Sequence, residues 1–173
     1  IFKDGTCIIY NDVRKFGSLH WSNKIENNFL IKNLGVEPLS NKFNADYLYS
    51  VGKKRKVAIK NLIMNQKIVT GIGNIYASEC LFLAKIQPNK KSNRLNQQNY
   101  IDLVSAVKKV LSIAIRKGGT TIKDFKTIDG KPGYFQQELS VYGRETCPCG
   151  LNIKLKKIKI NGRTSFFCGK CQK

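Results

Sequence analysis

The clearest apolar periodicity lies between residues 44 and 117, where hydrophobic residues recur every three or four positions, as along one helix face. This pattern predicts four helices, over residues 44–51, 56–65, 74–85 and 96–117. The longest is the best defined, because Asn96 can cap its start and Gly118 and Gly119 follow its last basic residues. Its expected buried stripe is Tyr100, Leu103, Val104, Val107, Val110, Leu111 and Ala114.

The first segment has a different pattern. Residues 1–21 alternate well enough to predict two strands joined at Asp4-Gly5, with a further turn near Asn11-Asp12. The alternating pattern at Ile1 resembles the middle of a β-hairpin rather than its start. We therefore expect further sequence to precede this residue. Residues 22–43 predict a short helix and a connecting loop.

Beyond the longest helix, residues 118–133 are rich in Gly and Thr and predict a loop, and residues 134–142 predict a short helix. The composition changes completely near Gly143, which predicts a domain boundary there. We therefore divide the chain into four parts, residues 1–21, 22–43, 44–143 and 144–173.

The last part combines a hairpin pattern with two pairs of cysteines. Two alternating segments, residues 153–160 and 163–167, flank Asn161-Gly162, a strong signal for a two-residue hairpin turn. Cysteine pairs on either side of a hairpin can close a tetrahedron around Zn²⁺, which would stabilise a tail too short for a core of its own. Two disulfides are the alternative, which the two further unpaired cysteines of the chain disfavour. The first pair has C-x-C spacing rather than the C-x-x-C usual in zinc ribbons, which is the irregular feature of the zinc prediction. The predicted ligands are Cys147, Cys149, Cys168 and Cys171, whereas Cys7 and Cys80 are expected to be small buried hydrophobic residues.

The joint between the second and third predicted helices contains two glycines. Gly71 and Gly73 allow unusual backbone angles there and leave peptide N–H groups uncovered. Asn74 can cap the helix that follows, and a helix N-terminus favours a bound anion. The joint is therefore a candidate anion site.

The charge balance suggests which anion is bound. The chain has 31 Lys and Arg against 11 Asp and Glu, a formal net charge of +20. A Lys-rich solvated surface is one interpretation, but charge placed beside aromatics and turn glycines favours a polyanion such as nucleic acid. Arg163, just past the hairpin turn, could enter a groove of DNA or could be an ordinary solvated side chain. No apolar run approaches the roughly 20 residues of a membrane helix.

Four motifs in order resemble the bacterial formamidopyrimidine-DNA glycosylases over nearly the whole chain. They are D-V-R-K-F-G, K-I-V-T-G-I-G-N-I-Y-A-S-E, G-G-T-T-I-K-D-F with D-G-K-P-G-Y-F, and Y-G-R with the R-T-S-F-F-C-G-K-C-Q tail. The resemblance implies a mainly α fold: a helix–two-turn–helix domain plus a C-terminal β-hairpin zinc ribbon, preceded by remnant strands of a truncated β-sandwich. It also implies a monomeric base-excision repair enzyme of the bacterial cytoplasm, associated with the nucleoid, that binds damaged duplex DNA.

The resemblance assigns DNA-contacting roles to individual residues. Arg14 would bond the orphaned cytosine and Phe16 would wedge against the neighbouring base, although Phe16 looks like a core residue without the resemblance. The loop Thr120, Thr121, Ile122 and Lys123 would close over 8-oxoguanine. Arg163 would grip phosphates and assist the last elimination step. Contacts with the DNA backbone would come from Lys54, Arg55, Lys56, Lys67, Gly71, Gly73, Asn74 and Tyr142.

The resemblance further implies removal of oxidised purines, chiefly 8-oxoguanine and formamidopyrimidines, followed by strand nicking through β,δ-elimination. In the family an N-terminal proline amine is the nucleophile. We expect this chain to begin downstream of that residue, and therefore to bind DNA without excising bases.

Two alternatives remain. One is a non-enzymatic zinc-ribbon protein that binds nucleic acid. The other is a glycosylase of the endonuclease VIII type acting on oxidised pyrimidines, which the G-G-T-T and G-K-P-G-Y-F runs disfavour.

Overall fold

The computed structural model describes residues 2–12, 15–120, 138–150 and 152–173. It divides into two compact units, Ile1–Lys32 and Asn33–Lys173, each of which is treated by itself. None of the described helices is long and apolar enough to cross a membrane.

The first unit is largely irregular. Gly5 donates its backbone N–H to the carbonyl of Phe2 at 3.1 Å, so the predicted turn is present, and η1 (Ile25–Asn27) is the short helix. The described residues of 1–21 form no strand, so the prediction of two strands is wrong for them. A two-stranded hairpin is only marginally stable without an apolar face packed on something else. Within this unit the apolar side chains remain exposed, Cys7 and Trp21 among them, so the expected burial of Cys7 is also wrong.

The second unit contains the four helices predicted between residues 44 and 117, whereas the short helix predicted over residues 134–142 lies partly outside the described residues and is absent from 139–142. The four helices are α1 (Ala45–Lys53), α2 (Ile59–Ile63), α3 (Asn74–Leu83) and α4 (Gln97–Arg116), with a 3-10 turn η2 (Ser92–Arg94) before α4. Asn96 caps α4 through its side chain, as the sequence predicts, and Asn44 caps α1 in the same way. The helix α2 is shorter than expected, because Ala58 is extended and pairs with Lys91, and the Val57 carbonyl accepts the N–H of Ser92.

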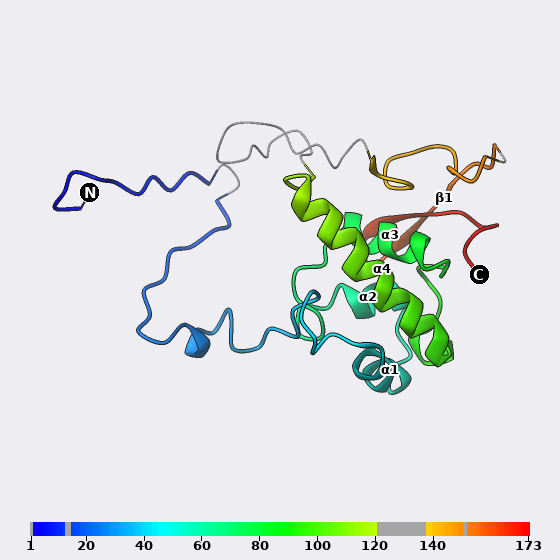
Figure 1. Ribbon diagram of the computed structural model, residues 1–173, viewed down its shortest axis with the longest axis horizontal. Coiled ribbons are helices and arrows are strands. Elements are labelled where there is room, and N and C mark those ends of the chain that lie inside the picture. The colour runs from blue at the N-terminus through cyan, green and yellow to red at the C-terminus, as the bar shows by residue number, and fades with distance from the viewer. Residues whose placement is uncertain (1, 13–14, 121–137, 151) are drawn as a thin grey trace. The chain divides into compact units, whose positions relative to one another are not determined.

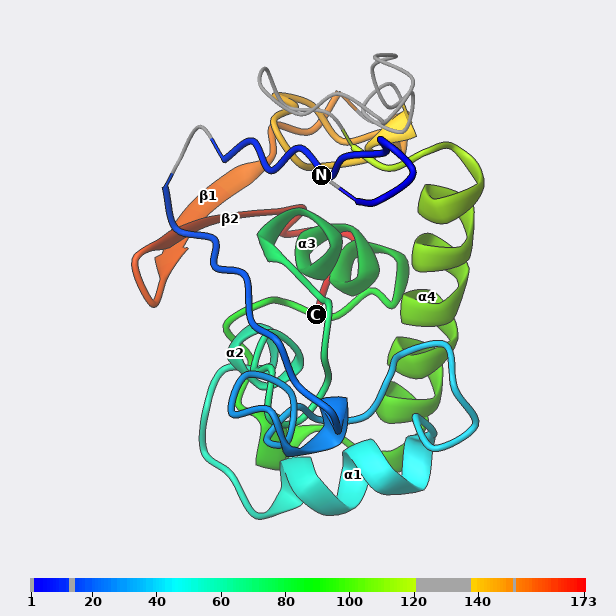
Figure 2. The ribbon, with the colours of Figure 1, turned by 90° about the vertical axis from the view of Figure 1, so that its left-hand side faces the viewer.

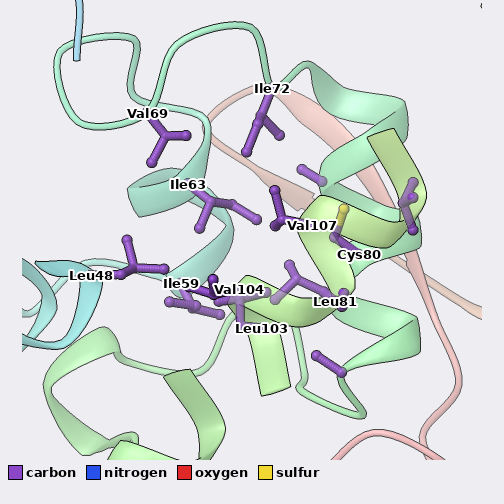
Figure 3. Packing of buried hydrophobic residues seen from close by; sticks show 14 of the residues in the cluster. Leu48, Ile59, Ile63, Val69, Ile72, Cys80, Leu81, Leu103, Val104 and Val107 are labelled. Carbon is purple, nitrogen blue, oxygen red and sulfur yellow. The ribbon is translucent and has the colours of Figure 1, made fainter. Parts of the chain in front are cut away.

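The helices enclose one apolar core (Figure 3). The helix α4 packs along α3 and also against α1, which lies at one end of this unit (Figure 1). All seven residues of the predicted α4 stripe are buried. The close-up shows side chains of α2, α3 and α4 pointing toward one another, and the buried Cys80 sits among them as predicted. Val57, which lies in the apolar pattern of the helix predicted over residues 56–65, is 41% exposed.

The tail forms the predicted hairpin. Strand β1 (Lys156–Ile160) pairs antiparallel with β2 (Arg163–Phe167), and Ile160 lies opposite Arg163. Asn161 and Gly162 both have positive φ, 49° and 73°, as the tight turn between two such strands requires. The strand prediction is confirmed, with β1 starting three residues later than the alternating pattern.

The hairpin is docked on α3 rather than extending from the unit as a separate arm. The side chain of the buried Gln172 accepts the N–H of Cys168 at 2.8 Å and donates to the carbonyl of Ile86 at 2.7 Å. The backbone N–H of Lys173 reaches the carbonyl of Lys85 at 3.1 Å. These bonds fix the end of the tail to the turn that follows α3.

Candidate nucleic-acid interface and metal centre

The turn between α2 and α3 differs from its prediction in detail. Gly71 has φ +78°, so the need for glycine is confirmed there, but its N–H donates to the side chain of Gln66 at 2.9 Å. Gly73 has φ −94°, an angle open to any residue, and it is Gly73 that occupies the N-cap position of α3. A Cβ added to either glycine would meet nothing within 4 Å. The turn therefore presents an open backbone surface at the N-terminus of a ten-residue helix.

Asn74 does not cap α3 with its side chain, so that prediction is wrong. Its amide instead joins three segments of the chain. Its Oδ1 accepts a hydrogen bond from Lys60 Nζ at 2.7 Å, and its Nδ2 donates to the Tyr142 hydroxyl at 3.3 Å and to the Thr164 carbonyl at 3.1 Å. The glycine turn and the cysteine hairpin are thereby parts of one surface.

Lys60 is the central residue beneath this surface. It is 1% exposed, and its Nζ donates to Ser78 Oγ at 3.0 Å and Ser165 Oγ at 2.8 Å in addition to Asn74. All three acceptors are neutral oxygens. Burial, and then the charge of Arg163, lower the pKa of Lys60 to about 8. A buried ammonium thus links α2 to α3 and β2 without a carboxylate among these partners.

Glu79 is a second buried charge, on the same helix as Asn74. Its carboxylate is 4% exposed and accepts the backbone N–H groups of Ser140, Val141 and Tyr142 at 2.7, 3.0 and 2.8 Å. Charge-assisted bonds of this kind hold a loop firmly. The ring of Tyr142 is fixed further by an edge contact with Phe166, whose centroid lies 5.0 Å away.

A cleft of about 370 Å³ separates the hairpin turn from the region around α2. Arg55 and Arg163 both line it, and no acidic residue does. The rest of its lining consists of apolar side chains and carboxamides, contributed by Val57, Leu62, Met64, Ile68, Ile160, Asn61, Asn65 and Asn161. Two guanidinium groups beside one cleft suit a phosphate, which Arg can bind with several donors at once. The structure therefore brings together two of the predicted phosphate contacts.

The four predicted metal ligands form one cluster. Their Sγ atoms all lie within 4.8 Å of one another, and Cys147 Sγ is 3.8 Å from Cys171 Sγ. A Zn–S bond of about 2.3 Å gives sulfur separations of about 3.8 Å in a tetrahedron. The C-x-C spacing of the first pair is therefore compatible with a metal site. All the described cysteines are free, which does not support the disulfide alternative.

The environment of this cluster favours a thiolate at Cys168. Burial opposes ionisation of Cys168, but hydrogen bonds from the backbone of Cys171 and Lys170 and from the Cys147 and Cys171 side chains outweigh it, so the pKa of Cys168 is lowered to about 7. Burial raises the pKa of Cys147 to about 12, and the side chain of Cys168 raises that of Cys171. A metal ion binds thiolates rather than thiols. The four cysteines can thus hold a metal ion.

Residues 34–126 match the family model described as the formamidopyrimidine-DNA glycosylase H2TH domain, where H2TH stands for helix–two-turn–helix. This match covers more than half of the chain. The chain belongs to this family.

The chain is also similar in sequence to curated formamidopyrimidine-DNA glycosylases. The formamidopyrimidine-DNA glycosylase of Hydrogenovibrio crunogenus is 47% identical over 175 residues, and that of Vibrio atlanticus is 46% identical over 171 residues. These alignments include 100% and 98% of this chain but 62% and 63% of the two relatives. The chain therefore spans a little under two thirds of their length.

Solved structures share the fold of this H2TH-family chain. The MutM (Fpg) protein of Thermus thermophilus superposes with a TM-score of 0.77 at 35% identity, covering 83% of this chain and 55% of that protein. The Lactococcus lactis Fpg bound to abasic-site DNA gives a TM-score of 0.75 at 35% identity, with 84% and 54% covered.

For several other residues that were predicted to contact DNA, the structure shows only where they lie. Lys54, Lys56 and Lys67 are exposed on the surface. Phe16 is 83% exposed in the first unit, and Thr120 bonds the hydroxyl of Tyr76 at 3.1 Å. The remaining predictions fall on Arg14, Thr121, Ile122 and Lys123, which lie outside the described residues.

Sequence reasoning missed Lys60 and Glu79. Both lie on helices among apolar neighbours, where a lone charged residue usually belongs to the solvent face. The only signal was the place of Glu79 at the end of a family motif, and Lys60 lies outside the motifs. Their partners, Ser165 and Ser140–Tyr142, are 105 and about 60 residues away in sequence, so local pattern could not reveal them.

Proposed function

We propose that this protein is a DNA glycosylase and AP lyase that removes oxidised purines from duplex DNA and nicks the strand by β,δ-elimination. Membership of the H2TH family and the names of its relatives support the reaction class. The residues described above would hold the damaged duplex, and the protein would act as a monomer in the bacterial cytoplasm, associated with the nucleoid.

The observation that carries the proposal is the hydrogen bond from Asn74 to the Thr164 carbonyl. It places the open glycine turn of α3 beside the arginine end of the hairpin. A helix N-terminus and a guanidinium group both bind phosphate, and two such sites on one surface can bind successive parts of a DNA backbone. The net charge of +20 adds the long-range attraction that such a surface needs.

We propose Zn²⁺ as the metal of the cysteine cluster, because four thiolates in a closed tetrahedron suit this ion. Zinc bound there supplies no reaction chemistry and stabilises the hairpin that carries Arg163. Cys147, Cys149, Cys168 and Cys171 would be its ligands.

The remaining roles follow from family resemblance. Arg14 would bond the base opposite the lesion, and Phe16 would fill the gap in the base stack. The loop from Thr120 to Lys123 would cover the damaged base. Arg163 would bind phosphates at the lesion and assist the last elimination step.

Fluorescence anisotropy with two otherwise identical duplexes tests the binding proposal, one of which carries an abasic-site analogue. We expect the protein to bind the damaged duplex more tightly, and Arg163→Ala to weaken binding while the metal content stays unchanged. Arg116→Ala is the matched control, because it removes an exposed arginine at the end of α4. Equal affinity for the two duplexes would contradict damage recognition.

Cleavage tests the reaction class. The whole protein should cut 8-oxoguanine duplexes in single-turnover reactions faster than thymine-glycol duplexes. The opposite preference would favour the endonuclease VIII type. Binding without any cleavage by the whole protein would favour a non-enzymatic zinc-ribbon protein.

A further inference from the structure

Two basic segments far apart in sequence lie side by side in the second unit. One is residues 54–56, between α1 and α2, and the other is residues 90–94, which includes η2. Together they carry Lys54, Arg55, Lys56, Lys90, Lys91 and Arg94, which we call the cationic double loop. Family resemblance gave roles only to the first segment, so the second segment is unexplained by the proposed function.

Backbone hydrogen bonds fix the two segments to each other. Ser92 N–H donates to the Val57 carbonyl at 2.8 Å, and Ile59 N–H donates to the Lys90 carbonyl at 2.8 Å. The Ser92 hydroxyl also donates to the Arg55 carbonyl at 2.6 Å. The arrangement of these charges is therefore built into the fold and does not depend on flexible side chains meeting by chance.

The cationic double loop carries charges of one sign only. Residues 53–60 and 86–95 contain no Asp or Glu. The six basic side chains of the double loop are exposed, apart from the half-buried Lys90. Holding like charges together costs free energy unless an anion is bound. Ile59, Ile86 and Leu95 are buried in these segments, and Val57, at 41%, is their one exposed large apolar side chain. A single valine does not form a hydrophobic centre of the kind found in protein interfaces.

The double loop is continuous with the candidate interface. Arg55 belongs to it and also lines the cleft that Arg163 lines from the hairpin. The connection between α1 and α2 and the turn between β1 and β2 lie on the same side of the unit in Figure 2. A DNA backbone that reaches the cleft could therefore continue over the double loop.

We propose that the cationic double loop binds the sugar-phosphate backbone of duplex DNA outside the lesion, as an extension of the interface around Arg163. This inference rests on the proposed function. Its contacts are sequence-independent charge contacts, so they affect affinity and salt dependence rather than choice of lesion. The absence of an exposed apolar centre favours DNA over an acidic protein as the partner.

Duplex length provides the test. Anisotropy is measured with lesion duplexes of about one and about three helical turns, where a turn is about 10 base pairs. The unchanged protein should bind the long duplex more tightly. Lys90→Gln/Lys91→Gln should lose most of that gain, with a salt slope smaller by up to about 1.8, or about 0.9 for each phosphate that the variant no longer neutralises. On the short duplex the variant should bind as the unchanged protein does.

Lys85→Gln/Lys109→Gln is the matched control, because it removes the same charge from two exposed lysines outside the double loop, one just after α3 and one on α4. It should keep the length gain. An equal loss in the control, or a length gain that Lys90→Gln/Lys91→Gln leaves intact, would overturn the inference. The double loop would be assigned to a protein partner by two results together: Lys90→Gln/Lys91→Gln keeps the length gain, and the same variant no longer binds an acidic polypeptide that the unchanged protein binds. Failure of the unchanged protein to bind any lesion duplex would instead refute the proposed function.

Discussion

The helical core and the cysteine hairpin of the second unit are stabilised in different ways. The core packs residues from all four helices into one apolar cluster, whereas the buried cluster of the hairpin consists of Val141, Cys147, Leu155 and Cys168. So small a cluster cannot stabilise a hairpin without a further constraint. The candidate DNA interface lies where the two regions meet, so its geometry depends on both apolar packing and the proposed metal site.

Loss of the metal should have the largest effect. Chelation, or Cys168→Ser, is expected to unfold the hairpin and to weaken DNA binding by at least about tenfold, since Arg163 and Thr164 lose their positions. Helical content measured by circular dichroism should persist, because the main core contains no metal ligand. Simultaneous loss of the helices would show that the two regions are a single cooperative unit.

Lys60→Met tests the link between the regions. The change removes the donor that serves Asn74, Ser78 and Ser165 and leaves buried polar atoms unpaired. We expect the free energy of unfolding, measured with urea, to fall by about 3 kcal/mol. Lys109→Met, on the exposed face of α4, should change it by less than about 0.5 kcal/mol. Equal effects of the two substitutions would contradict the structural role of Lys60.

Gly52→Ala affects the helical core alone. A Cβ at this position would collide with the ring and hydroxyl of Tyr100, which donates to the Ser92 carbonyl at 2.8 Å. The expected loss of stability is about 2 kcal/mol, with metal content unchanged. Gly73→Ala is the control, since its Cβ meets nothing within 4 Å and its φ is −94°. Metal loss in Gly52→Ala would show that core packing determines the cysteine site.

The smallest expected effect is the pH dependence of the Lys60 contribution. Its pKa is about 8 in the folded protein and is 10.5 ordinarily, so the unfolded chain binds more protons between these values. Stability then rises with pH across this range. Lys60→Met lacks this titration, so the difference in unfolding free energy between the unchanged protein and the variant should widen from pH 8 upward. A constant or narrowing difference would mean that Lys60 titrates normally.

Much of this fold follows from sequence patterns that act locally. Helix α4 and its cap at Asn96 depend on neighbours three or four residues away, and the hairpin turn depends on Asn161-Gly162. The strands expected in residues 1–21 need a packed face, which periodicity alone does not supply.

The candidate site was predicted in outline only. The cysteine set and the arginines came from motifs, but Asn74 was mistaken for a cap because its partners come from distant segments. Lys60 and Glu79 were missed for the same reason. The role of a buried polar residue depends on the partners that the fold brings close to it, and sequence patterns do not reveal these partners.

The central claim is that the glycine turn of α3 and the cysteine hairpin bind DNA as one surface. The salt dependence of binding to an abasic-site duplex tests it most directly. The slope of log K against log salt concentration should correspond to roughly four to six phosphate contacts at about −0.9 each, and Arg163→Ala should reduce its magnitude by about 0.9. An affinity independent of salt, or a slope that Arg163→Ala leaves unchanged, would contradict the account.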